Sequence, residues 1–218
     1  MATLKEKILK YQEAFKEKVP LDTRMTMIDA TQKLNVARIS EKALQRGDTV
    51  EPFTLQNAQK VDVSLQESLD NNDFVVLNFF RGGWCPYCNL ELKELQLYSE
   101  YFKALKTQVL SISPQVPSES KKTIEKNSLT FEVLSDEKNV IAKKFGLVFA
   151  LPRELKPIYK SFKIDIVMAN EDTSYELPMA ATYVLNKEGV IVHAFVDEDY
   201  TRRLEPKKLL VQIRKLAN

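Results

Sequence analysis

The sequence has few of the residues that build disulfide scaffolds or metal centres, with two cysteines and one histidine among 218 residues. Secreted disulfide-rich domains spread many cysteines along the chain, so that class is excluded. Long hydrophobic runs are also missing, because the longest, near residues 74–80, is far too short to span a membrane. Residues 1–10 mix lysine and glutamate with single apolar residues, which is not typical of a secretory signal. We therefore expect a soluble, cytoplasmic protein.

An excess of either charge is absent as well. The chain carries 32 Lys and Arg residues against 30 Asp and Glu, which gives a formal net charge of +2. This balance gives no electrostatic reason to expect nucleic acid or an acidic membrane as a partner. The apolar fraction of 44% is ordinary for a globular protein. The length suits one domain with an extension or two small domains.

The two cysteines, Cys85 and Cys88, lie three residues apart. A disulfide between them would close a trivial loop, so such a pair is usually kept for thiol exchange, peroxide reduction or metal binding. A structural zinc site needs about four ligands, but the chain has no other cysteine and its only histidine is His193. We therefore expect no metal and no cofactor. Apolar neighbours on both sides of His193 predict a half-buried strand histidine rather than a catalytic base.

Residues 1–46 are predicted to form a helical N-terminal extension. Leu4, Ile8, Tyr11 and Phe15 fall on one face of a helix, and Pro20 ends that element. No chemical group stands out in this region. An apolar stripe of this kind normally needs burial, so we expect the extension to pack against the rest of the chain or to form a homodimer.

From residue 47 to residue 218 the pattern changes to alternating strands and helices. Expected strands cover residues 53–55, 61–63, 74–80, 109–112, 131–134, 183–185 and 190–195; expected helices follow residue 64 and cover 86–105, 118–127, 139–145 and 205–216, and residues 147–180 are expected to be irregular. Two parallel crossovers followed by a hairpin and a last helix predict an α/β domain with a mixed central sheet and helices on both faces. That is the order of a thioredoxin-like fold.

The cysteine pair falls between a buried strand and a long helix. Pro86 suits the first helical turn, which puts Cys85 close to the N-cap. Free backbone N–H groups and the helix dipole favour a thiolate there, and Arg81 adds positive charge if its side chain turns toward the sulfur. The second thiol of the pair can then attack a mixed disulfide or a sulfenic acid formed on its partner.

At these residues the sequence resembles the AhpC/TSA, or redoxin, peroxiredoxin-like family of the thioredoxin superfamily. It is most similar to the members with an Arg-Gly-Gly-Trp-Cys-Pro-Tyr-Cys segment, here residues 81–88. The resemblance runs from about Gly47 to Leu216, with weaker matches in the expected order at residues 47–48, 53–55, 112–114, 134–136, 145–147 and 182–185. It implies reduction of peroxides by a cysteine, with thioredoxin or a similar thiol as the reductant.

Two registers compete within this resemblance. In the thioredoxin register, Trp84 and Pro86 flank the attacking Cys85. In the peroxiredoxin register, Cys88 takes the attacking position, Glu91 fits the acidic position, and Cys85 replaces a threonine. Which sulfur attacks first therefore stays open.

The segments that follow the cysteine pair in the chain match the peroxiredoxin pattern less well. Peroxiredoxins often carry an arginine just before Thr182, where this chain has Met179-Ala180. The loop from Asp197 to Arg203 mixes charges of both signs. We expect it to be solvated, and the alternative is that it borders the site.

The predicted function is a thiol-dependent peroxidase for hydrogen peroxide or organic hydroperoxides, recycled by a thioredoxin-like or glutathione-type reductant. The alternative is a general thiol–disulfide oxidoreductase with Cys85 as the nucleophile. A redox sensor or an interaction module, with a partner bound to the N-terminal helices, is a third reading. The fold alone does not choose among the three.

Overall fold

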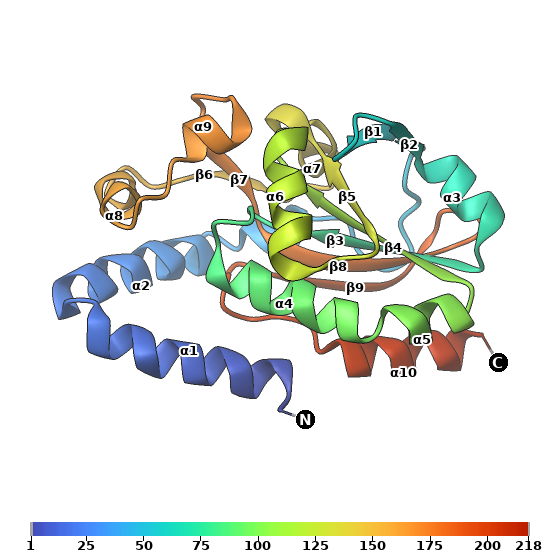
Figure 1. Cartoon of the computed structure of the whole chain (residues 1–218), viewed down its shortest axis with the longest axis horizontal. Helices are drawn as coiled ribbons and strands as arrows, with labels where there is room; N and C mark the ends of the chain where they lie inside the picture. Colours follow the sequence, from blue (N-terminus) through green and yellow to red (C-terminus); the bar gives the residue numbers. More distant parts are fainter. Residues whose placement is uncertain (1, 218) are drawn as a thin grey trace.

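The computed structural model describes residues 2–217, and its N-terminal part is helical (Figure 1). Helix α1 (Leu4–Lys18) begins after Thr3, whose hydroxyl accepts a hydrogen bond from the Glu6 N–H while the Glu6 carboxylate accepts one from the Thr3 N–H. Helix α2 (Leu21–Val36) and the 3-10 helix η1 (Ile39–Lys42) follow. The predicted helical extension is present.

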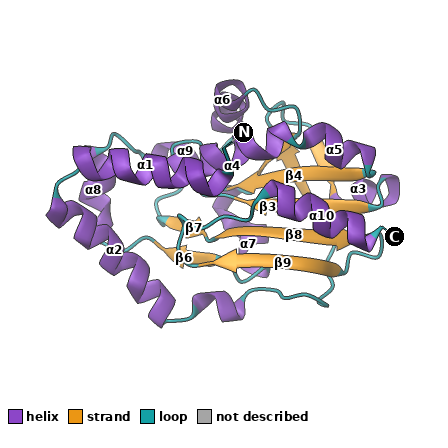
Figure 2. Ribbon diagram, turned by 90° about the horizontal axis from the view of Figure 1, so that it is seen from below, coloured by secondary structure: helices purple, strands orange, loops and turns teal. Residues whose placement is uncertain are grey.

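Seven strands form the main sheet, in the order β2-β1-β5-β4-β3-β8-β9. Figure 2 shows β4, β3, β8 and β9 of this sheet side by side. They are β1 (Thr54–Asn57), β2 (Asp62–Ser64), β3 (Phe74–Phe79), β4 (Thr107–Ser113), β5 (Glu132–Ser135), β8 (Ala180–Asn186) and β9 (Ile191–Asp197). Strand β4 runs parallel to both β3 and β5, whereas β8 is antiparallel to β3 and to β9. The two crossovers and the C-terminal hairpin match the prediction, so the thioredoxin-like fold is confirmed.

Helices cover both faces of this sheet. They are α3 (Leu65–Asn71), α4 (Pro86–Leu97), α5 (Ser99–Ala104), α6 (Pro117–Asn127), α7 (Val140–Lys144) and α10 (Pro206–Leu216). Alternate residues of β3 point to opposite faces, so Leu77 packs with Leu69 of α3, while Val76 packs with Leu95 of α4 and Leu209 of α10. Burial on both faces explains why the β3 sequence is apolar almost throughout.

Two regions differ from the sequence prediction. Residues 147–180, expected to be irregular, contain β6 (Val148–Ala150), α8 (Leu155–Ser161), α9 (Ile166–Asn170) and β7 (Glu176–Pro178). Strands β6 and β7 pair as a separate small sheet. These elements are too short to show a hydrophobic period, and their prolines lie in a first helical turn or at a strand end. The helix expected over residues 86–105 is divided at Tyr98 into α4 and α5.

Helix α1 is attached to the main domain along its apolar stripe. Leu4 and Ile8 are buried in one cluster with Phe80 of the sheet end and with the two cysteines. The carboxylate of Glu205 accepts a hydrogen bond from the Leu4 N–H at 3.1 Å. The extension therefore packs beside the cysteine pair, with a carboxylate at the positive end of its dipole.

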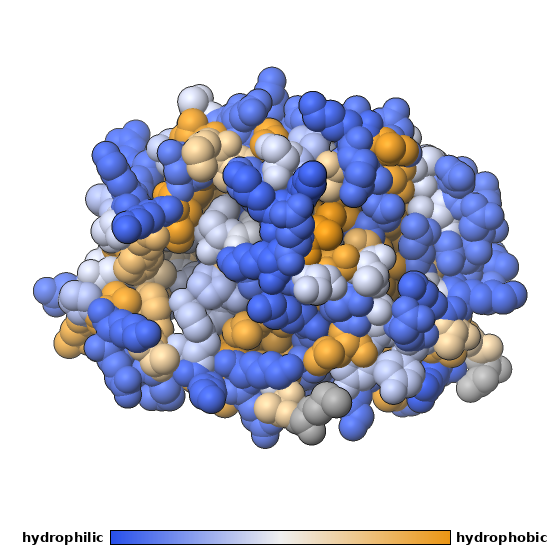
Figure 3. All heavy atoms as spheres, viewed as in Figure 1, coloured by the Kyte–Doolittle hydropathy of each residue, from blue (hydrophilic) through white to orange (hydrophobic). Residues whose placement is uncertain are grey.

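None of the helices within residues 2–217 is long and apolar enough to cross a bilayer. The face drawn in Figure 3 is largely hydrophilic, with hydrophobic residues in separate groups between hydrophilic ones.

Candidate active site

The two cysteines lie where the chain leaves β3 and enters α4. Cys85 is the N-cap residue of α4, with φ −82° and ψ 120°, and Pro86 is the first helical residue, as the sequence predicts. The Cys85 N–H donates to the Gly82 carbonyl at 3.0 Å, which closes the loop tightly. Cys85 therefore lies at the start of α4, where the N–H groups of the first turn have no partner within the helix. These groups favour a negative charge on the Cys85 sulfur.

A buried network of amides holds this loop in place. The Asn89 amide donates to the carbonyls of Gly83 at 2.8 Å and of Cys85 at 2.9 Å, and accepts from the Asn127 amide at 2.8 Å. Gln115 accepts the Gly83 N–H at 2.8 Å. These partners come from α4, α6 and the segment after β4, so three parts of the fold fix the approach to Cys85.

Each sulfur lies against its own buried arginine. Arg81 Nη2 donates to Cys85 Sγ at 3.6 Å, and Arg203 Nη2 donates to Cys88 Sγ at 3.5 Å. Both cysteines are free thiols without exposed surface, and Arg81 is only 4% exposed. Arg81 thus turns toward the sulfur, as the sequence analysis considered, whereas Arg203 is an addition that the sequence analysis missed.

The two thiols differ in their protonation. Burial opposes ionisation of Cys85, but a hydrogen bond from the Cys88 thiol and the charges of Arg81 and Arg203 outweigh it and hold the Cys85 pKa well below its usual range. Burial, together with donation to Cys85 and its negative charge, raises the Cys88 pKa well above the usual value. The arrangement therefore stabilises one thiolate, on Cys85, beside one neutral thiol.

Glu91 occupies the next turn of α4 and forms an ion pair with Arg203. Arg203 Nε lies 2.8 Å from Glu91 Oε2, and the two side chains are 0% and 3% exposed. Burial raises the pKa of Glu91 to about 7, although the charge of Arg203 works in the opposite direction. Glu91 therefore reaches the cysteine pair through Arg203, which lies between the carboxylate and Cys88.

The loop from Asp197 to Arg203 is not simply solvated, so this expectation was wrong. Arg202 follows the prediction, with 71% of its side chain exposed, but Arg203 and Tyr200 turn inward to the cysteines. One feature of the sequence hints at a buried arginine elsewhere, namely the absence of an arginine just before Thr182. In the structure, Arg203 brings a guanidinium to the cysteines from a different segment. Charge patterning alone does not tell which of two neighbouring arginines is buried.

Aromatic rings enclose the Arg81 end of the site. The Arg81 guanidinium carbon lies 4.1 Å from the ring centre of Tyr200, 5.1 Å from that of Trp84 and 6.0 Å from that of Tyr159. Such rings stabilise a cation that has lost its water. Tyr159 belongs to α8, so the region expected to be irregular contributes to the site.

His193 lies outside the site, half-buried on β9 as predicted, and burial lowers its pKa. Among residues 2–217, no group of three or more His, Cys, Asp or Glu side chains is arranged to hold a metal ion.

The model of the AhpC/TSA family matches residues 46–194, which include the sheet strands β1 to β8 and both cysteines. Helices α1 and α2 lie outside the matched part.

Curated relatives carry peroxiredoxin names. A protein named as a peroxiredoxin bcp from Buchnera aphidicola is 32% identical over 104 residues, which is 48% of this chain and 65% of that protein. The chloroplastic peroxiredoxin Q of Sedum lineare is 27% identical over 171 residues, or 78% of this chain and 76% of that protein. The chain thus matches slightly less than two thirds of the first relative and about three quarters of the second.

Solved structures share the fold at low identity. The peroxidoxin BcpB of Mycobacterium tuberculosis has a TM-score of 0.62 and 19% identity, and the match covers 79% of this chain and 98% of that one. PrxQ of Xylella fastidiosa also has a TM-score of 0.62, with 17% identity over 80% of this chain and 98% of that one. Both leave about a fifth of this chain unmatched.

Proposed function

Because the chain belongs to the AhpC/TSA family, we propose that it is a thiol-dependent peroxidase that reduces hydrogen peroxide or organic hydroperoxides through Cys85 and Cys88. The peroxiredoxin names of its relatives support this activity. The observation that carries the proposal is the placement of a buried arginine against each buried sulfur. A cation beside the sulfur stabilises the thiolate and also the negative charge that develops on the departing peroxide oxygen.

The lowered pKa of Cys85 supports its role as the attacking sulfur. The Cys85 thiolate attacks one peroxide oxygen, the O–O bond breaks, and the other oxygen takes up a proton and leaves as water or an alcohol. Cys85 is then a sulfenic acid. The Cys88 thiol attacks that sulfur, water leaves, and a Cys85–Cys88 disulfide forms. A thioredoxin-like or glutathione-type thiol supplies the two electrons that restore both thiols.

The residues around the pair have separate tasks in this scheme. Arg81 holds the Cys85 thiolate, and Trp84 covers Arg81. Pro86 starts the helix whose N-terminus faces the sulfur. Glu91 positions Arg203 against Cys88. This set supports placing the chain with the family members that carry the Arg-Gly-Gly-Trp-Cys-Pro-Tyr-Cys segment.

The test is peroxide consumption by the reduced protein and by its Cys85→Ser and Cys88→Ser variants, with intact mass recorded after one equivalent of hydrogen peroxide. We expect rapid consumption and a loss of two hydrogens in the unchanged chain. Cys88→Ser should retain a sulfenic acid on Cys85, whereas Cys85→Ser should react slowly. A reaction no faster than that of a free thiol would sink the proposal, and a sulfenic acid trapped only on Cys88 would reverse the order of attack.

A general thiol–disulfide oxidoreductase is the second candidate, because Cys85 at a helix N-cap with a lowered pKa also suits attack on disulfides. The complete burial of both sulfurs favours a small oxidant over a protein disulfide. Insulin reduction without peroxide consumption would support this second candidate.

We also propose that residues 1–46 are an extension to a thioredoxin-like domain of residues 47–218 and that two copies associate through it. Leu21, Met25 and Val36 of α2 are 60%, 47% and 84% exposed, and burial between copies would stabilise them. Light scattering should give a dimer for the full chain and a monomer for Leu21→Glu/Met25→Glu. A monomer in both samples would refute the dimer.

A further inference from the structure

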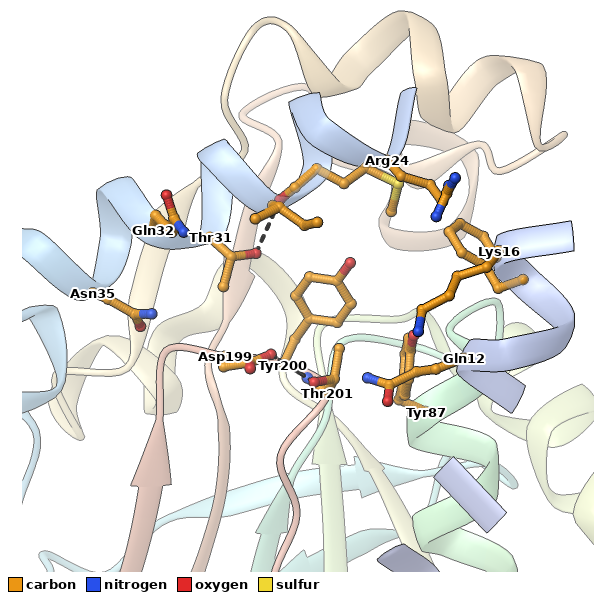
Figure 4. Close-up of a pocket in the computed structure, with 13 residues that line it drawn as sticks. Gln12, Lys16, Arg24, Thr31, Gln32, Asn35, Tyr87, Asp199, Tyr200 and Thr201 are labelled. Carbon is orange, nitrogen blue, oxygen red and sulfur yellow. Dashed lines mark hydrogen bonds between the residues drawn. The ribbon is translucent and has the colours of Figure 1, made fainter. Parts of the chain in front are cut away.

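A cavity of about 410 Å³ lies beside the cysteine pair, between the N-terminal helices and the loop that carries Tyr200 (Figure 4). Lys16 of α1, Arg24 of α2, Tyr87 of α4 and Tyr200 are among the residues that line it. Its volume falls within the range of about 300–1,000 Å³ that is usual for small-molecule sites. Because α1 and α2 lie outside the matched family region, this cavity is a feature added to the family fold.

The charged groups of the cavity have both signs. Lys16 pairs with Glu13 at 2.8 Å, but their side chains are 55% and 68% exposed, so this pair competes weakly with a ligand. Arg24 Nε donates to the Val19 carbonyl at 3.1 Å, and the hydrogen bonds found among the described residues leave its two terminal nitrogens free. Asp199 is the acidic group of the lining; it accepts from Thr201, and its carboxylate lies 3.6 Å from Arg202 Nε in a pair whose arginine side chain is 71% exposed and so competes weakly with a ligand. The cavity thus offers two cations and one anion.

The other lining side chains suit a peptide. Gln12, Gln32 and Asn35 place amides around the cavity, where they can donate to and accept from peptide groups, and Phe15 and Met27 add apolar surface. A ligand with amide bonds would satisfy these side chains, whereas a hydrocarbon chain would leave them unpaired.

Tyr87 and Tyr200 separate the cavity from the sulfurs. Their rings meet edge to face with centres 5.5 Å apart. The other side of the Tyr200 ring faces Arg81, which contacts Cys85, and Tyr87 lies in the first turn of α4 between the two cysteines in sequence. A molecule in the cavity is therefore one aromatic layer away from the redox pair. Movement of the Tyr200 loop would open the path, and a large protein thiol would need a much wider opening.

We propose that this cavity binds the reductant of the Cys85–Cys88 disulfide, a small thiol peptide with two carboxylates and one ammonium group, which is the charge pattern of glutathione. The carboxylates bind Lys16 and Arg24, and the ammonium group binds Asp199. The assignment rests on the proposed peroxidase cycle and names the reductant that completes it.

The chemistry of the reduction follows from the two thiols. The thiolate of the first peptide attacks the Cys88 sulfur, the Cys85–Cys88 bond breaks, and Cys85 leaves as a thiolate, because the thiol of lower pKa is the better leaving group. A second peptide thiolate attacks the peptide sulfur of the mixed disulfide. Cys88 leaves and takes up a proton, and the oxidised peptide disulfide is released, while the two electrons remain with the restored thiols of Cys85 and Cys88.

The first experiment measures reduction of the oxidised full chain by glutathione, by glutathione diethyl ester and by dithiothreitol. We expect saturation with glutathione but not with its ester. In Lys16→Gln/Arg24→Gln, the ratio of the glutathione rate to the dithiothreitol rate should fall about tenfold, as expected for lost charge-assisted hydrogen bonds. Lys10→Gln/Lys18→Gln is the matched control, since both lysines are exposed on α1 outside the cavity lining, and it should keep the ratio.

The second experiment measures binding of S-methylglutathione, which has no free thiol, to the reduced full chain by calorimetry. Binding that weakens about tenfold in Lys16→Gln/Arg24→Gln but not in the control would support the site independently of turnover. Such binding without any peroxide consumption would overturn the peroxidase and leave the site standing. Peroxide consumption with equal use of glutathione and its ester, and no effect of the variants, would overturn the site and leave the peroxidase standing.

Discussion

The guanidinium of Arg203 lies 3.5 Å from the sulfur of Cys88, although 115 positions separate the two residues in the chain. The same guanidinium is 2.8 Å from the carboxylate of Glu91, one helical turn after Cys88. Arg203 therefore connects the C-terminal loop to the helix of the redox pair and gives the second cysteine a cation of its own.

Removal of Arg203 should lower the free energy of unfolding more at pH 8 than at pH 6. The Glu91 pKa rises from 4.5 in the unfolded chain to about 7 in the folded one, so the folded state holds an extra proton between these values and the free energy of unfolding falls as pH rises through them. Arg203→Met removes the charge that limits this rise, so the fall should continue above pH 7. Breaking a buried pair costs about 3–5 kcal/mol, and we expect a loss near this size at pH 8 and a smaller one at pH 6.

Urea unfolding at the two pH values measures this difference. Arg202→Met is the control, because its side chain is 71% exposed and should contribute less than about 0.5 kcal/mol. Equal losses for Arg203→Met at both pH values would show that Glu91 does not control the pH dependence.

The pKa values of the two cysteines should be shifted in opposite directions from the usual thiol value. In Cys88→Ser, the serine hydroxyl can still donate to Cys85, and the Cys85 pKa should stay below the usual thiol range. In Cys85→Ser, burial should keep the Cys88 pKa above that range. Ultraviolet absorbance of the thiolate against pH measures both. Addition of Arg81→Met to Cys88→Ser should raise the Cys85 pKa, and an unchanged titration would rule out Arg81 as the stabilising cation.

Tyr200 should limit the size of the molecules that reach Cys85. Its ring covers Arg81 at 4.1 Å and contacts Tyr87, so Tyr200→Ala should open the path to the sulfur. The reaction with a bulky aromatic disulfide reagent should become several-fold faster, because access limits thiol exchange at a buried sulfur. Tyr101→Ala, at a position that is 54% exposed, is the control. Equal rates for the two variants would place the entry path elsewhere.

The loop before Cys85 should not tolerate a side chain at Gly83. A Cβ there would lie 2.1 Å from the Thr123 hydroxyl of α6, so Gly83→Ala should lower the free energy of unfolding by about 1–3 kcal/mol. Thr123→Ala removes the clashing atom, and the double variant should lose less than the sum of the single losses. Thermal unfolding of the four proteins measures the coupling, and strict additivity would locate the strain elsewhere.

The sequence by itself determined the fold order and the position of the redox pair. The continuous apolar run of β3 predicted a strand buried on both faces, and Pro86 after Cys85 predicted a cysteine at a helix N-cap, because both signals are local. The short elements of residues 147–180 gave no such signal, since three to seven residues are too few for a period to appear.

Only the tertiary structure decided what surrounds the sulfurs. Arg203, Tyr200 and Tyr159 come from distant segments, and their packing against Arg81 and Cys88 depends on how the C-terminal loop and α8 fold back over α4. Composition does not reveal that Arg203 is buried while its neighbour Arg202 is exposed. A local pattern fixes where a thiol sits on its helix, whereas its pKa depends on charges brought close by the whole fold.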